Sequence, residues 1–174
     1  QTDDEKVDMT STAMARKNSL WKYIQRIPLL MQEIDKPVIA AINGDAVGAG
    51  LDMALMCDIR FAAKTARLGE GYVNVGIVPG DGGAYFLPRI VGVDKALELL
   101  WTGKLLNADE AKEIGLVTHV VETDGLMEHV YAFAERLANG PQHALRMMKR
   151  AVYQGLNMEL RPALDMISSA MGLV

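Results

Sequence analysis

The sequence predicts an α/β fold in which short buried strands come early and amphipathic helices come late. The run 38–42 is short, apolar and rich in β-branched residues, as the buried strands of a parallel sheet are. A glycine-rich loop follows it, then a short apolar helix over 51–57 and a second strand over 58–62. Beyond about residue 124 the apolar residues recur at helical spacing. Strands and helices arranged in this way are typical of the α/β class.

The composition is that of a globular protein, since half of the 174 residues are apolar and 23% are charged. The formal net charge is −4 and no run of five basic residues occurs, so we expect no nucleic-acid partner. No apolar run reaches about 18 residues, so we expect no membrane-spanning helix. Cys57 is the only cysteine, which excludes a disulfide framework and indicates a reducing compartment such as the cytoplasm. The three histidines lack metal-ligand spacing, so we expect no bound metal.

The N-terminal part is expected to become helical after a polar start. Residues 1–17 predict a loop or a frayed helix, and the absence of an initiator methionine indicates that the sequence begins inside a longer chain. In the helix that follows, Pro28 should produce a kink and Lys36-Pro37 the end. The apolar stripe that predicts this helix consists of Leu20, Tyr23, Ile24, Ile27, Met31 and Ile34.

The middle of the chain is expected to mix loops with short elements. The stretch 69–83 is rich in glycine, which allows the backbone to approach itself or a ligand closely. A helix is expected over 94–102. The residues 107–110 have the spacing of a capping box that begins another helix, with Gly115 as its end. Apolar pairs within 116–121 indicate one brief strand.

The last part of the chain is expected to form three helices, at about 124–138, 141–154 and 157–171. They are interpreted as a separate layer or an oligomer arm, far from the sheet. An apolar stripe on the first of them could lie between subunits or pack internally. Its members are Leu126, Val130, Phe133 and Leu137.

The loop Gly48-Ala49-Gly50 leads directly into the short apolar helix. The first backbone N–H groups of a helix have no internal partners and carry partial positive charge. Small residues let an oxygen atom approach these groups closely, which is how a backbone oxyanion hole is built. Taken alone, the pattern favours a structural turn over an anion site.

A longer set of motifs, in order from about Lys36 to Gly155, changes this interpretation. The segments are 36–44 (KPVIAAING), 46–50 (AVGAG), 56–60 (MCDIR), 75–83 (VGIVPGDGG), 87–92 (LPRIVG), 102–103 (TG), 108–111 (ADEA) and 114–117 (IGLV). Together they closely resemble the signature of the crotonase, or enoyl-CoA hydratase/isomerase, superfamily.

The resemblance implies an α/β fold of the crotonase type, a superhelix of ββα units with a C-terminal helical trimerisation region. On this basis we assign residues 1–125 to the C-terminal portion of the crotonase core and residues 126–174 to the helical oligomerisation region. The resemblance implies a homotrimer or a hexamer. It also implies an acyl-CoA thioester as the substrate, in which coenzyme A is part of the substrate and no separate cofactor is needed.

The resemblance further implies two backbone N–H donors that hold the thioester oxygen as it becomes an enolate. Matching places one donor at Ala49, with Gly48 and Gly50 as substrate-binding neighbours. The other donor belongs to an upstream segment that these 174 residues do not contain, and the first strands of the family fold are missing with it. We therefore expect a polypeptide limited to these residues to be inactive.

Family hydratases use two glutamates around a bound water, and the matching positions here are Asp52 and Tyr72. Asp52 keeps a carboxylate on a shorter side chain, whereas Tyr72 has a phenol, which is a poor base at neutral pH. We expect Asp52 to be the acid/base group and Tyr72 its hydrogen-bonding partner. Glu70, Gly80 and Asp81 are expected to contribute to substrate binding. Without the resemblance, Asp52 would be interpreted as a helix-capping acid.

The sequence thus predicts an acyl-CoA-processing enzyme of fatty acid metabolism, either a hydratase (a lyase) or an isomerase. Two alternatives stay open. One is a CoA-thioester hydrolase or decarboxylase of the same fold. The other is a catalytically inactive binding or scaffold protein, which the departures at Asp52 and Tyr72 would explain. Lys149 and Arg150 are interpreted as a solvated helix face, with CoA phosphates as their alternative partners.

Overall fold

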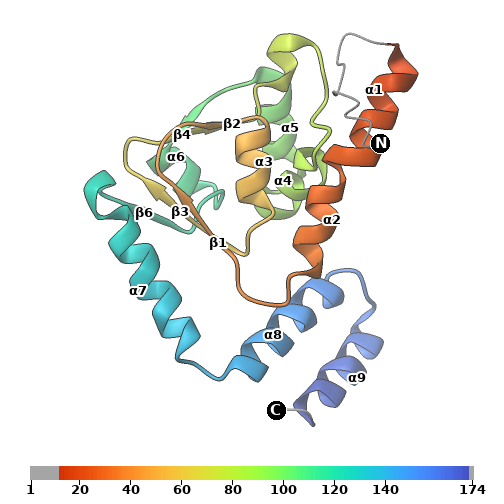
Figure 1. The fold of residues 1–174 in the computed structure, drawn as a ribbon, viewed down its shortest axis with the longest axis vertical. Helices are drawn as coiled ribbons and strands as arrows, with labels where there is room; N and C mark the ends of the chain where they lie inside the picture. Colours follow the sequence, from red (N-terminus) through yellow and green to blue (C-terminus); the bar gives the residue numbers. More distant parts are fainter. Residues whose placement is uncertain (1–11, 173–174) are drawn as a thin grey trace, which may run out of the picture.

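Two small sheets form the centre of residues 12–172, the part of the chain that the computed structural model describes (Figure 1). The first sheet has the order β1-β3-β6 and contains β1 (Ile39–Ile42), β3 (Ile59–Ala63) and β6 (His119–Val121). All of its strands are parallel, with Ile39 opposite Ile59 and Phe61 opposite His119. The second sheet has the order β2-β4-β5 and contains β2 (Ala46–Val47), β4 (Arg67–Gly69) and β5 (Leu106–Asn107).

In the first two turns of the fold, the chain passes from one sheet to the other before it forms a helix. β1 and β2 are followed by α3 (Ala49–Leu55). β3 and β4 are followed by a 3-10 turn, η2 (Tyr72–Val75), and by α4 (Gly83–Val91). Each pair of strands thus gives one strand to each sheet, which confirms the predicted ββα arrangement. In the third turn the order changes, and α6 (Ala108–Glu113) lies between β5 and β6.

The predicted parallel strands are confirmed, with small shifts at their ends, because apolar β-branched runs are a strong strand signal. β2, β4 and β5 were not predicted. They are two or three residues long, too short to show an alternating pattern. α4 was also missed, because Pro88 lies inside it and proline normally indicates the end of a helix.

The N-terminal helical segment is broken as predicted. It consists of α1 (Ala13–Ser19), a π-helical turn η1 (Leu20–Ile24) and α2 (Arg26–Glu33). Pro28 has no N–H to donate to the carbonyl of Ile24, and the helix is interrupted at Gln25, between η1 and α2. The Gln25 side chain then donates to the Gly80 carbonyl at 3.0 Å, which attaches this segment to the glycine-rich loop. The prediction for residues 1–11 lies outside the described residues.

The capping box before α6 is confirmed in both directions. The Glu110 N–H donates to Asn107 Oδ1 at 2.9 Å, and the Asn107 N–H donates to Glu110 Oε2 at 2.8 Å. Gly115 follows the helix with a φ of 77°, the left-handed conformation that glycine adopts without strain. The predicted helix at 94–102 is α5 (Val93–Thr102).

The late helices form as predicted, but the first of them is not far from the sheet. After a short turn, η3 (Thr123–Gly125), α7 (Leu126–Ala138) packs on β1 and β3. Leu126 and Val130 are buried in the core, and the Phe133 ring meets Phe61 edge-on at 5.5 Å. The apolar stripe therefore packs internally through these residues, and it does not by itself indicate an oligomer.

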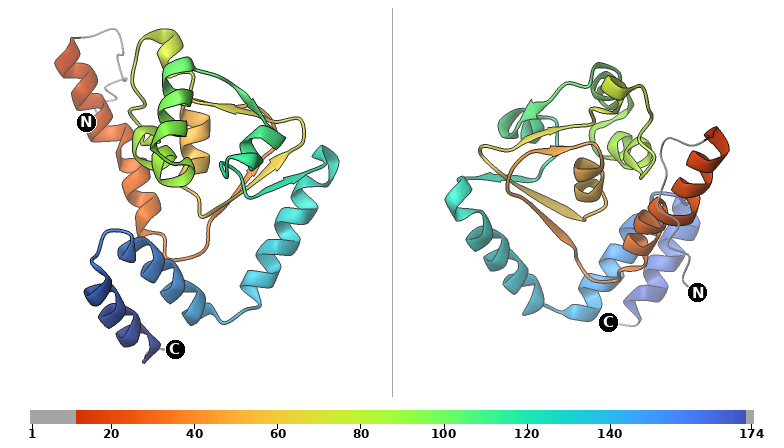
Figure 2. Two further views of the ribbon diagram at one scale, coloured as in Figure 1. Left: turned by 180° about the vertical axis from the view of Figure 1, so that it is seen from behind. Right: turned by 45° about the horizontal axis from the view of Figure 1, so that its top comes forward.

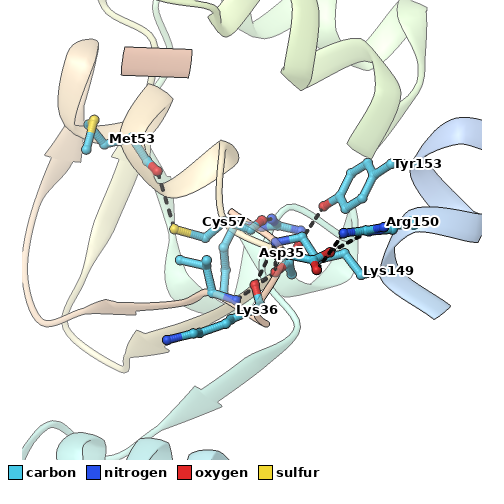
Figure 3. A network of polar contacts seen from close by, with 10 residues as sticks. Asp35, Lys36, Met53, Cys57, Lys149, Arg150 and Tyr153 are labelled. Atoms are coloured by element: carbon cyan, nitrogen blue, oxygen red, sulfur yellow. Dashed lines mark hydrogen bonds and ion pairs between the residues drawn. The ribbon is translucent and has the colours of Figure 1, made fainter. Parts of the chain in front are cut away.

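Two further helices, α8 (Gln142–Gly155) and α9 (Leu160–Met171), lie beyond α7 and away from the sheets (Figures 1 and 2). Lys149 and Arg150 attach α8 to the core through Asp58 and Asp35. Figure 3 shows Lys149 and Arg150 beside Asp35. Lys149 Nζ donates to Asp58 Oδ2 at 2.8 Å, and its side chain is 14% exposed. The interpretation of a solvated face is therefore wrong for Lys149, which is largely buried against Asp58, whereas the Arg150 side chain is 53% exposed and lies at the surface beside Asp35. No helix among residues 12–172 is long and apolar enough to cross a membrane.

Candidate active site

The start of α3 presents its backbone to the surface. Gly48 precedes the helix with φ 56° and ψ −124°, a conformation that disfavours any residue with a Cβ. Its N–H donates to the Gly69 carbonyl at 2.9 Å, which joins the loop to the end of β4. Ala49 and Gly50 are exposed. The first N–H groups of a helix have no partner within it, and the small exposed residues here leave room for an oxygen atom to approach.

Asp52 lies in the first turn of α3 and is fully buried, with 0% of its surface exposed. Its position three residues after Ala49 brings its carboxyl to the same end of the helix. Oδ2 of Asp52 lies 2.8 Å from the Tyr72 hydroxyl. Oδ1 of Asp52 has no hydrogen-bond partner among the described residues.

Tyr72 connects two carboxyl groups. It begins η2 directly after Gly71, whose φ is 58°. Its hydroxyl lies 2.8 Å from Asp52 Oδ2 and 2.5 Å from Asp81 Oδ1. A phenol carries one proton and can donate only one hydrogen bond. If both contacts are hydrogen bonds, one of the two carboxyl groups must itself be protonated.

Glu70 is buried next to this group of residues. It directly follows β4 and is 1% exposed, so its side chain does not reach the surface. Both of its carboxylate oxygens lack a hydrogen-bond partner among the described residues. A buried carboxylate without donors is costly, so these atoms point to a proton that the group has retained.

Gly83 allows the carboxyl groups to come together. A Cβ on Gly83 would lie 2.2 Å from Asp52 Oδ1 and 2.9 Å from Glu70 Oε2. Only glycine fits at this place, because any side chain would displace the Asp52 carboxyl. The sequence analysis missed Gly83 as a site residue, although the Gly82-Gly83 pair was part of the glycine-rich stretch.

The surroundings favour the neutral forms of these acids. Burial, contact with Asp81 and the charge of Glu70 raise the pKa of Asp52 to about 8, against a smaller opposing effect of the Tyr72 hydrogen bond. Burial also raises the pKa of Glu70, to about 7, and contact with Asp52 opposes that rise. Burial and the two neighbouring carboxyl groups raise the pKa of Tyr72 above its usual range. Tyr72 is therefore a hydrogen-bond donor and not a base.

The structure thus brings together Asp52, Tyr72, Asp81 and Glu70, from three separate segments, at the end of α3 where Ala49 lies. Gly80 lies next to Asp81, but its carbonyl is occupied by Gln25. Their roles toward a substrate stay predictions. Within residues 12–172, no three His, Cys, Asp or Glu side chains are grouped as metal ligands.

A separate cavity lies at the other end of α3. It has a volume of about 760 Å³, and Cys57, Phe86, Arg89 and Tyr153 are among the residues that line it. None of the four clustered site residues lines this cavity. It is therefore separate from the candidate active site.

Comparison with known proteins shows which family the chain resembles. The enoyl-CoA hydratase/isomerase family model matches residues 4–170. A crotonyl-CoA hydratase from Syntrophomonas wolfei is 42% identical over 149 residues, which are 86% of this chain and 57% of that protein. An enoyl-CoA hydratase structure from Bacillus anthracis has 37% identity and a TM-score of 0.88, covering 93% of this chain and 62% of that one.

A third relative is a Thermobifida fusca protein proposed as an enoyl-CoA hydratase and solved in complex with CoA. It has 32% identity and a TM-score of 0.86, and the match covers 91% of this chain and 61% of that chain. The chain therefore spans somewhat more than half the length of these relatives. The extent of the family match and the similarity of the folds lead to one conclusion: this chain belongs to the enoyl-CoA hydratase/isomerase family and has the crotonase fold.

Proposed function

We propose that the protein containing this chain stabilises the enolate of an acyl-CoA thioester, most simply during the hydration of an enoyl-CoA. The observation that carries the proposal is the position of the buried Asp52 carboxyl, one helical turn from the exposed start of α3 at Ala49. A thioester oxygen at the Ala49 N–H would gain the stabilisation that a preorganised donor provides. Family membership and the CoA bound to the Thermobifida fusca relative support a CoA substrate.

In this proposal, water adds its oxygen to the β-carbon while negative charge develops on the thioester oxygen. Asp52 donates its proton to the α-carbon, using the electron pair of the enolate. One proton of the attacking water returns to the carboxyl group, with Tyr72 orienting the water. A pKa near 8 suits Asp52 to this work, because it holds a proton at neutral pH and can still release it.

Isomerisation is a second candidate, and one feature favours it. Moving a double bond requires one group that removes a proton and returns it, and Asp52 is the only carboxyl at the two positions where family hydratases have glutamates. We propose the cytoplasm as the compartment, in keeping with the single unpaired Cys57.

A screen of CoA thioesters with the full-length protein, read by mass spectrometry, tests the proposed function. Hydration adds the mass of one water to an enoyl-CoA, whereas isomerisation leaves the mass unchanged and moves the double bond. Release of free CoA indicates a hydrolase, and loss of carbon dioxide indicates a decarboxylase. Binding without turnover across the screen would contradict the proposal and support a scaffold protein.

Tyr72→Phe is expected to lower kcat roughly tenfold, the effect of losing one hydrogen bond of about 1–1.5 kcal/mol. The phenyl ring keeps its place but cannot donate to Asp52 or Asp81. Steady-state kinetics on the full-length protein measure the effect, with Tyr131→Phe on the exposed face of α7 as the matched control. A loss as large as that of Asp52→Asn would mean that Tyr72 itself transfers a proton.

We also propose a homotrimer or a dimer of trimers. Family membership supports it, and so do the exposed apolar side chains of α8 and α9, among them Met148, Val152, Leu160 and Met171. Light scattering of the full-length protein is expected to give the mass of three or six subunits. A monomer at micromolar concentration would rule this assembly out.

A further inference from the structure

The Glu70 and Asp52 side chains face each other without a donor between them. Three of their four carboxyl oxygens have no hydrogen-bond partner among the described residues, namely Asp52 Oδ1 and both oxygens of Glu70. Burial raises the pKa of Glu70, and contact with Asp52 opposes that rise. The two side chains also converge on one point, the place where Gly83 lacks a Cβ. Two ionised carboxylates in this arrangement would repel each other.

One proton between the two carboxyls resolves this conflict. A carboxyl O–H on either residue donates to the other, and the pair then carries a single negative charge. We propose that Glu70 is a positioning residue that shares one proton with Asp52 and so keeps Asp52 able to protonate the substrate α-carbon. The last part of this inference rests on the proposed function, whereas the shared proton does not.

Within residues 12–172, none of the groups that act on the pair is a cation that would favour its ionised form. The groups that act on Asp52 are Asp81, Glu70 and Tyr72, and all of them are acids. Helix α4 packs against α3, and its first residue, Gly83, lies against the two carboxyl groups. The cation of α4, Arg89, is stacked on the Tyr85 ring with its guanidinium carbon 3.6 Å from the ring centre. Loss of the shared proton would therefore leave two buried negative charges uncompensated.

The exchange of protons during hydration follows from this arrangement. The O–H bond of Asp52 breaks as the C–H bond at the α-carbon forms. The attacking water then gives a proton to Asp52 Oδ2, the oxygen that Tyr72 contacts. The pair regains one proton as it loses one, so it never has to carry two charges. Glu70 touches no substrate in this scheme, since every proton that reaches or leaves the substrate passes through Asp52.

The test uses Glu70→Gln in the full-length protein, with Glu135→Gln on α7 as the matched control. Glutamine has nearly the same shape but carries no negative charge, so Asp52 should ionise at lower pH. The falling limb of the kcat/KM profile at alkaline pH is expected to move toward acid by about one pH unit or more. Glu70→Asp, which restores a carboxyl, should return the limb toward its original place. A limb that stays in place in Glu70→Gln would overturn the proposal.

A second measurement does not depend on turnover. The C=O stretch of protonated Asp52, identified by its loss in Asp52→Asn, is followed by infrared spectroscopy from about pH 5 to about pH 9. The signal is expected to persist to higher pH in the wild type than in Glu70→Gln, by about one unit or more. Equal midpoints in the two proteins would show that no proton is shared. If no CoA thioester is turned over but the midpoints differ, the proposed function fails and the shared proton stands.

Discussion

Asp52→Asn in the full-length protein is expected to lower kcat by roughly 10²-fold or more, the usual contribution of a positioned acid/base group. Asparagine keeps the size of the side chain and can still accept from Tyr72, but it cannot give up a proton to a substrate. Asp52 is fully buried, so a solvent water cannot easily take over its role. Its pKa, raised to about 8, lets it hold a proton at neutral pH. Steady-state kinetics at neutral pH, with circular dichroism as a check on folding, measure the effect.

Asp109→Asn is the matched control, because Asp109 is exposed at the surface, where it forms an ion pair with Lys64. An exposed ion pair contributes about 0–1 kcal/mol to stability, so its loss should leave the protein folded. The kcat of Asp109→Asn should therefore stay close to that of the wild type. Near-normal turnover in Asp52→Asn, together with loss of activity in Asp81→Asn or Glu70→Gln, would show that the role assignment is wrong. Family membership would not be affected.

Gly83→Ala is expected to lower kcat on the order of 10²-fold, as misplacing a catalytic group by about 1 Å does. The added methyl would lie 2.2 Å from Asp52 Oδ1, so the carboxyl must move away from it. Movement of the carboxyl breaks its contact with Tyr72, which is 2.8 Å long. Overpacking of this buried position should also destabilise the fold by about 1–3 kcal/mol, so thermal unfolding is measured beside kcat.

Gly44→Ala is the control for Gly83→Ala, because a Cβ at Gly44 meets nothing within 4 Å. It should change neither kcat nor the unfolding temperature by much. If Gly83→Ala folds and keeps normal kcat, the close contact with Asp52 has no part in positioning it. If Gly83→Ala lowers only stability, the residue serves packing alone.

Local patterns in the sequence were sufficient for much of the fold. The apolar run at 38–42 predicted β1, and the capping box at 107–110 predicted the start of α6. Pro28 predicted the break between η1 and α2. Each of these features depends on residues close together in the chain, where side-chain shape and hydrogen bonding act directly on the backbone. The series of motifs from about Lys36 to Gly155 identified the family, because the order of the motifs along the chain can be read without knowing the fold.

The tertiary structure alone decided how the candidate site is assembled. Tyr72 meets Asp52 across 20 residues of sequence, and Glu70 and Asp52 approach each other only because Gly83 leaves room. It also decided that α7 packs on the sheet, where Leu126 and Val130 are buried, although the same stripe would suit a subunit contact. Periodicity shows that a face is apolar but not what covers it, and a sequence shows that carboxyls are present but not that they share one buried space. Burial and proximity are properties of the packed chain, so the raised pKa of Asp52 follows from the fold and not from the residue.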